Sequence, residues 1–169
     1  MAIDEDYGKL QAALMKKDFS KMTGIDFIAV GGGGDQGLAE FKKDVKTLFT
    51  KYRTDVPAAP LKLDGGRWVW AKRIEPDTDI NYLNEEDKAV KSVTRKIRVE
   101  VSFDKGVPST ETLDFSRFAL LAIDLKDKDQ FNPEMMFFVD YVSHDPITKD
   151  ETTKLVRDIV IDFPVTELK

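Results

Sequence analysis

The spacing of apolar side chains changes near Pro60, and this change restricts the possible folds more than any other feature of the sequence. Before Pro60 the apolar residues recur every three or four positions, which is typical of amphipathic helices. After Pro60 they alternate with polar residues, which is typical of strands with one buried face. The sequence therefore predicts helices in the first 60 residues and strands beyond them.

Two helices are expected before Pro60. The first covers about residues 4–22, where apolar residues recur at helical spacing until Thr23-Gly24 ends the pattern. The second has the clearest apolar stripe in the chain, with Asp35 placed to cap its start and a proline-rich stretch after it. Its stripe is formed by Leu38, Phe41, Val45, Leu48, Phe49 and Tyr52.

Five strands are expected after Pro60. Alternation marks three of them, at residues 68–71, 97–103 and 159–165. Residues 113–125 and 134–143 are more uniformly apolar, as in central strands covered on both faces, with a bulge expected near Ser116-Arg117. Short polar turns connect the strands, so antiparallel pairing is expected. The predicted fold class is α+β, with two N-terminal helices followed by a mainly antiparallel sheet of about five strands.

This pattern predicts a division of the chain into two parts. Residues 1–60 are expected to form a helical N-terminal arm with a glycine-rich hinge at residues 31–34, and residues 61–169 an antiparallel β-rich domain. The hinge consists of Gly31, Gly32, Gly33 and Gly34.

The glycine run also matches a nucleotide-binding fingerprint, because Gly32, Gly34 and Gly37 satisfy G-x-G-x-x-G. A dinucleotide fold needs a second parallel strand ending in an acidic residue, but no strand pattern leads into Asp55. The P-loop pattern fails as well, since its lysine and hydroxyl residue are absent after Gly37. A hinge or tight turn is therefore the favoured interpretation, and anion binding through main-chain N–H groups stays open.

Composition excludes several classes of function. The chain has 169 residues and no cysteine, so disulfides, thiol nucleophiles and cysteine-rich metal sites are ruled out. A formal net charge of −5 argues against bulk attraction to nucleic acid or anionic lipid. The acidic first residues and the short apolar runs predict no export signal and no membrane span. We expect a soluble protein of the cytoplasm, or of a virion if the chain is phage-encoded, without a membrane partner.

Candidate metal and catalytic residues are few. Asp77, Asp79 and Asn81 match the first ligands of a calcium loop, but Tyr82 and Lys88 occupy positions that need glycine and glutamate. A short helix capped by Asn84 is the favoured interpretation, and the calcium question stays open. A second acidic cluster, formed by Asp124, Asp127 and Asp129, is interpreted as a solvated turn.

The sequence offers little support for catalysis. The only histidine, His144, precedes an Asp-Pro turn, and its neighbours on a strand would point to opposite faces. We therefore predict no catalytic residue, no cofactor and no metal, and a protein that is not an enzyme.

Three functional hypotheses follow. The first is a non-catalytic structural or assembly protein, such as a virion or bacterial assembly component, that self-associates by docking the apolar face of its arm, formed by Leu14, Met15, Phe19 and Met22. The alternative is a protein that binds single-stranded nucleic acid through a basic strand and stacking aromatics, with Lys91, Arg95, Lys96, Arg98, Trp68 and Trp70 as contacts. The third is a small-molecule binder or enzyme with a pocket between helices and sheet.

Overall fold

The computed structural model describes residues 2–3, 24–34, 37–53, 55–123 and 136–163. This part of the chain is mostly β, with ten strands in two antiparallel sheets. Its elements in chain order are β1 (Ala2–Ile3), β2 (Phe27–Gly32), α2 (Leu38–Tyr52), β3 (Leu61–Lys62), the 3-10 turn η1 (Asp64–Gly66), β4 (Trp68–Arg73), α3 (Pro76–Asp79), β5 (Ile80–Leu83), β6 (Ala89–Val90), β7 (Lys96–Phe103), β8 (Leu113–Ile123), β9 (Met136–Lys149) and β10 (Leu155–Asp162).

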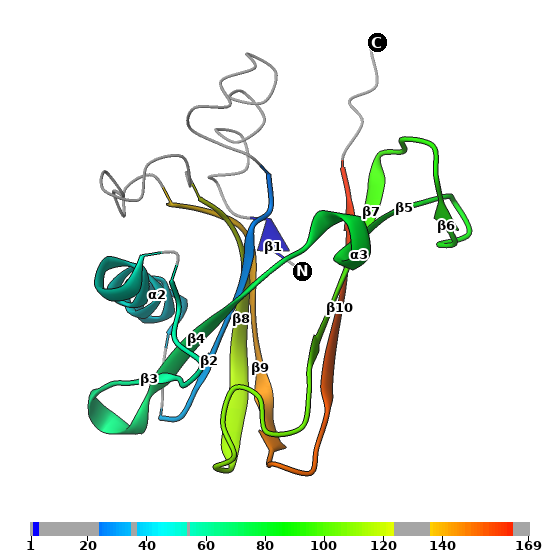
Figure 1. Ribbon diagram of the computed structural model, residues 1–169. Coiled ribbons are helices and arrows are strands. Elements are labelled where there is room, and N and C mark those ends of the chain that lie inside the picture. The colour runs from blue at the N-terminus through cyan, green and yellow to red at the C-terminus, as the bar shows by residue number, and fades with distance from the viewer. Residues whose placement is uncertain (1, 4–23, 35–36, 54, 124–135, 164–169) are drawn as a thin grey trace.

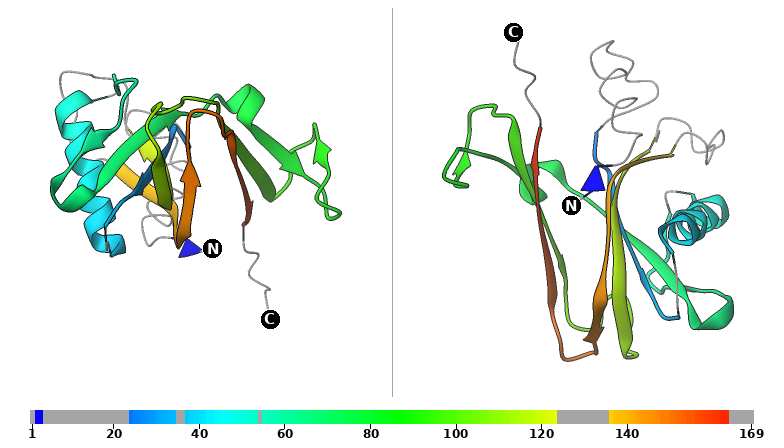
Figure 2. Two further views of the ribbon diagram at one scale, coloured as in Figure 1. Left: turned by 90° about the horizontal axis from the view of Figure 1, so that it is seen from below. Right: turned by 180° about the vertical axis from the view of Figure 1, so that it is seen from behind.

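The two sheets and the long helix form three layers. The six-stranded sheet has the order β1-β9-β8-β2-β4-β3, and the four-stranded sheet has the order β10-β7-β5-β6. Helix α2 lies against one face of the six-stranded sheet, and the four-stranded sheet lies on the other side of it (Figures 1 and 2). Three short connections, at residues 74–79, 104–112 and 150–154, lead the chain from one sheet to the other.

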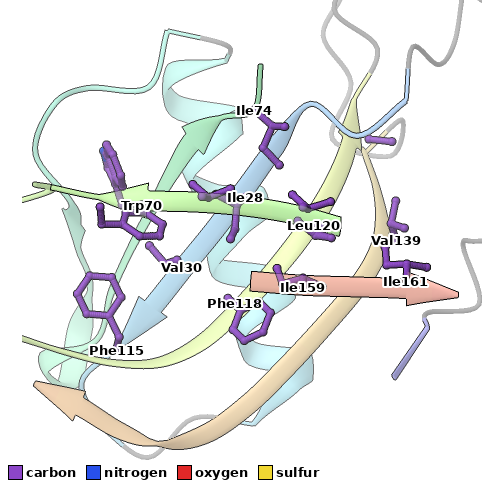
Figure 3. Close-up of a cluster of buried hydrophobic side chains, with 14 of the residues drawn as sticks. Ile28, Val30, Trp70, Ile74, Phe115, Phe118, Leu120, Val139, Ile159 and Ile161 are labelled. Atoms are coloured by element: carbon purple, nitrogen blue, oxygen red, sulfur yellow. The ribbon is translucent and has the colours of Figure 1, made fainter. Parts of the chain in front are cut away.

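Each layer boundary is filled by its own apolar cluster. Between the sheets, side chains from β2, β4 and β8 meet those of β7 and β10, as Figure 3 shows for Ile28, Val30, Ile159 and Ile161. Under α2, the apolar stripe predicted from the sequence packs on the alternate residues of β2, β4, β8 and β9. The six-stranded sheet thus has two buried faces, and its central strands are apolar on both sides.

The structure contradicts the predicted fold class. The described chain does not start with two helices followed by one sheet, because β2 precedes α2 and the strands form two sheets. The alternating pattern correctly marks β7 and β10 as strands with one buried face, but residues 68–71 of β4 are buried on both faces. The pattern also does not say which sheet each strand joins. Strands β3, β5 and β6 have only two to four residues, too few for a periodic pattern.

Several elements follow the prediction. The second helix is confirmed as α2, with five residues buried on its inner face. Strand β8 and the first half of β9 are covered on both faces as expected, whereas residues 145–148 of β9 are exposed. The bulge predicted near Ser116-Arg117 is a register shift between Phe115 and Arg117.

Other predictions differ from the structure or lie outside it. The helix expected over residues 4–22 and the capping residue Asp35 lie outside the described residues. The short helix expected after Asn84 is wrong, since these residues form the turn of the β5–β6 hairpin, where Asn84 Oδ1 accepts hydrogen bonds from the N–H groups of Glu86 and Lys88. Nothing tests the division at residue 60, although β2 pairs with β4 and β8, so such a division would run through one sheet.

Candidate functional site

The glycine run lies where main chains approach each other closely. Gly31 and Gly32 are the last residues of β2 and are paired with Val69 and Trp68 of β4. A Cβ atom on Gly32 would lie 1.6 Å from the carbonyl oxygen of Asp114, and Gly33 has a φ of +73°. The glycines at these positions are therefore explained by packing and backbone conformation. A hinge at residues 31–34 and an anion site there stay predictions.

Both tryptophans proposed to stack on bases are buried. Trp68 and Trp70 expose 4% and 7% of their surface and belong to the cluster between the sheets. The Trp70 indole N–H donates to the carbonyl oxygen of Pro57 at 2.7 Å. Neither ring offers a free face to a nucleic-acid base, which removes the aromatic half of that hypothesis.

The basic residues of the same hypothesis lie on the outer face and turns of the four-stranded sheet. Three of them contact carboxylates: Arg95 with Asp162 at 3.6 Å, Lys96 with Asp87 at 2.8 Å and Arg98 with Asp158 at 3.1 Å. The hydrogen bond with Asp87 raises the pKa of Lys96, and the same bond lowers the pKa of Asp87. Lys91 alone of the four has no ion pair with another described residue. This face therefore carries charges of both signs, and the nucleic-acid alternative stays a prediction.

The remaining sequence candidates do not converge. Asp77 and Asp79 lie on α3 and Asn81 on β5, and Asp79 Oδ2 accepts the main-chain N–H of Glu75 at 2.9 Å. No group of three possible metal ligands occurs among the residues that the structure describes. The arm residues Leu14, Met15, Phe19 and Met22, and the cluster Asp124, Asp127 and Asp129, lie outside them.

One hollow lined by described residues lies away from the predicted pocket between helices and sheet. The layer between α2 and the six-stranded sheet is filled by side chains such as Phe41, Leu48 and Phe138, each at most 2% exposed. A shallow hollow of about 380 Å³ lies instead at the outer end of the four-stranded sheet, against the turn after β5. Its lining residues are Leu83, Asn84, Glu85, Thr94, Arg95 and Lys96. The third hypothesis stays a prediction.

The strongest candidate for a functional site is the outer edge of β10. All eight residues of β10 pair with β7, and no described strand pairs with its other side. An edge strand of this length presents, on its open side, a row of main-chain N–H and C=O groups that can bind another strand. Val156, on the outer face of β10, is 46% exposed. We call this strand, with Asp158 and Asp162 on its outer face, the acidic edge.

One charged residue of β10 points inward. Arg157 lies between the sheets, where its guanidinium contacts His144 and lies 4.8 Å over the Phe118 ring. Burial lowers the pKa of this arginine. An inward-pointing charge on an edge strand hinders the addition of unrelated strands. The acidic edge therefore favours a partner strand that carries complementary, positive charge.

The opposite edge of the same sheet has the opposite charge. Strand β6 is flanked by Lys88 and Lys91, which are exposed and form no ion pair within the described part of the chain. Val93, two residues further on, is 79% exposed. We call β6 with these two lysines the basic edge. Figures 1 and 2 show it projecting away from the body of the protein, at the far end of the sheet from β10.

Sequence analysis missed both edges. The acids at positions 158 and 162 were visible as polar residues of an alternating strand, but edge position is a property of the strand order. Strand β6 is too short to give any pattern.

In comparisons with known proteins, no protein-family model matches the sequence and no curated protein is significantly similar to it. Within the described ranges, no helix has the length and apolar character needed to cross a membrane.

Proposed function

We propose that the protein is a non-catalytic assembly protein that associates with other protein chains, in the first place with copies of itself, through the open edge of its four-stranded sheet. The observation that supports this proposal is the eight-residue acidic edge, which among the described strands is paired on one side only. Strand addition to such an edge is a common mode of protein recognition, with main-chain hydrogen bonds supplying affinity.

The chemistry of the edge supports a specific rather than an accidental contact. Natural proteins protect exposed strand edges with charges, prolines or bulges. The acidic edge keeps two aspartates on its outer face, yet β10 has neither a proline nor a bulge, because its register with β7 is continuous. Such an edge repels an identical strand and accepts one that carries positive charge.

Sedimentation velocity of the whole protein over a wide range of concentration tests the proposal. We expect the mass to rise above the 19.2 kDa of one chain as concentration increases, because association follows mass action. A single species of one-chain mass at every concentration would contradict self-association. The predicted docking of the arm through residues such as Phe19 would also raise the mass, so variants of the edge are needed to identify the surface.

A further inference from the structure

We infer that the acidic edge binds the basic edge of a second copy, so that copies join head to tail through their four-stranded sheets. This inference rests on the proposed self-association and specifies its surface. It follows from three features of the sheet: the charge of its two edges, the direction of its strands and the alignment of their residues.

Charge distinguishes the two edges. The acidic edge presents Asp158 and Asp162, and the basic edge presents Lys88 and Lys91. Oppositely charged side chains across a strand pair stabilise it, whereas like charges destabilise it. Asp158 and Asp162 each contact an arginine of their own sheet, at 3.1 and 3.6 Å, whereas Lys88 and Lys91 form no ion pair within the described residues. Pairing β10 with β10 would bring four aspartates together without either lysine, so the charges favour an unlike pair of edges.

Strand direction permits this pairing. Every strand of the four-stranded sheet is antiparallel to its neighbours, so β10 and β6 run in opposite directions. A second copy placed beside the first in the same orientation brings its β10 next to β6 as an antiparallel neighbour. The joint then continues the pairing pattern of the sheet without any change within either chain.

Residue alignment places the charges close together. One row of the sheet contains Ala89, Leu83, Lys96 and Asp162, each paired with the next. When the rows are continued into the neighbouring copy, Ala89 lies opposite Asp162. Lys91 lies in the bend directly after β6, and an extension of the pairing by one residue would place it opposite Val160 and diagonal to Asp158 and Asp162. Diagonal neighbours remain within reach of a long lysine side chain.

A head-to-tail joint has a consequence for assembly size. An open assembly of any length keeps one free acidic edge at one end and one free basic edge at the other, so further copies add until the ends close into a ring or an open filament forms. The expected products are therefore larger than dimers.

Charge reversal on both edges tests the inference. One variant, D158K/D162K, has two basic edges, and the other, K88E/K91E, has two acidic edges. Each variant alone is expected to sediment as a monomer, because every joint between its copies would pair like charges. An equal mixture is expected to regain the large species, because alternating copies of the two variants pair a basic edge with an acidic edge at every joint. The matched control D64K/D77K changes two exposed acids away from both edges and is expected to assemble like the unaltered protein.

The outcomes separate this inference from the proposed function. If the unaltered protein is monomeric at all concentrations, both fail. If it assembles but the reversed variants assemble equally well, or their mixture does not recover, the head-to-tail joint is wrong while self-association stands. Circular dichroism of each variant shows whether it is folded, because Asp158 and Asp162 also contact Arg98 and Arg95.

Chemical cross-linking tests the same joint without altering charge. The chain contains no cysteine, so A89C and V160C each introduce a single thiol. With one variant carrying a longer tag, a short bismaleimide is expected to give mainly the mixed product, with little product from either variant alone. Efficient cross-linking of V160C to itself would show β10 against β10, and absence of the mixed product would equally overturn the inference.

Discussion

Asp140 is a buried carboxyl group in the middle of β9. It is 1% exposed, and its row of the sheet contains Leu120 of β8 and Ile3 of β1. Neither carboxyl oxygen has a hydrogen-bond partner of good geometry among the described residues. Desolvation raises the pKa of Asp140 to about 6, and the main-chain N–H of Tyr141 opposes this shift only in part.

Asp140 is expected to make the free energy of unfolding depend on pH. Between pH 4 and 6 the folded protein holds the proton while the unfolded chain has lost it, so the free energy of unfolding falls as pH rises. The shift corresponds to about 2 to 3 kcal/mol between the two ends of this range. Asp140→Asn is expected to remove this fall, as measured by urea unfolding at a series of pH values. An unchanged pH profile in the variant would show that other groups cause it.

Gly32 provides a second prediction for a single residue. Gly32→Ala places a methyl group against the carbonyl of Asp114, which belongs to the main chain and cannot move aside. We expect a loss of more than about 2 kcal/mol in the free energy of unfolding.

Gly37 is the matched control for this change. It precedes α2 with a φ of −74°, and nothing lies within 4 Å of its added Cβ. Gly37→Ala is expected to cost at most about 1 kcal/mol, the difference between glycine and alanine at a helix N-cap. Equal losses in the two variants, measured by urea unfolding, would contradict the role given to the close approach at Gly32.

Helix α2 is held to the sheet by a charged contact as well as by its apolar stripe. Arg67, directly before β4, donates to both carboxyl oxygens of Asp44, with distances of 3.1 and 3.3 Å. Asp44 is 4% exposed, while Glu40, the second partner of Arg67 at 3.3 Å, is exposed. The hydrogen bond with Asp44 raises the pKa of Arg67.

Removal of Arg67 is therefore expected to weaken the docking of α2. Arg67→Met takes two hydrogen bonds from a buried carboxylate and is expected to lower the urea midpoint more than Glu40→Ala does. The double variant Asp44→Leu with Arg67→Met is expected to recover part of the loss, since apolar side chains can replace a buried ion pair. A larger effect of Glu40→Ala would reverse this ranking.

The elements show what the sequence could predict. The stripe from Leu38 to Tyr52 identified α2, and the uniformly apolar runs identified β8 and β9, because burial on one stripe or on two faces leaves a local pattern. The choice of partner strand in a sheet leaves no such local pattern in the sequence. The alternation at residues 68–71 and 97–103 is alike, yet the first belongs to the six-stranded sheet and the second to the other.

The candidate site was less predictable because it depends on strand pairing, which leaves no local pattern in the sequence. Interpreting Trp68 and Trp70 as stacking residues required an exposed face, whereas their alternation placed them in the core. The significance of Asp158 and Asp162 depends on β10 being an edge strand, which only the assembled sheet determines. The turn at Asn84 resembled a helix start because asparagine caps helices and turns with the same side-chain oxygen.

At the scale of the whole molecule, assembly through charged edges is expected to respond to salt. The Debye length falls from about 10 Å at 0.1 M salt to about 3 Å at 1 M, so attraction between the acidic and basic edges is screened. Sedimentation equilibrium at these two ionic strengths should show weaker association in the higher salt. Association that strengthens with salt would indicate an apolar joint instead.

The central position of β2 has a consequence for synthesis of the chain. Its residue Ala29 pairs with Ala119 of β8, which leaves the ribosome 90 positions later. At 5 to 20 residues per second, this neighbour arrives after roughly 5 to 20 seconds. Meanwhile α2 and β4 can cover β2 only in part, and the apolar edge of the nascent sheet stays available to molecular chaperones.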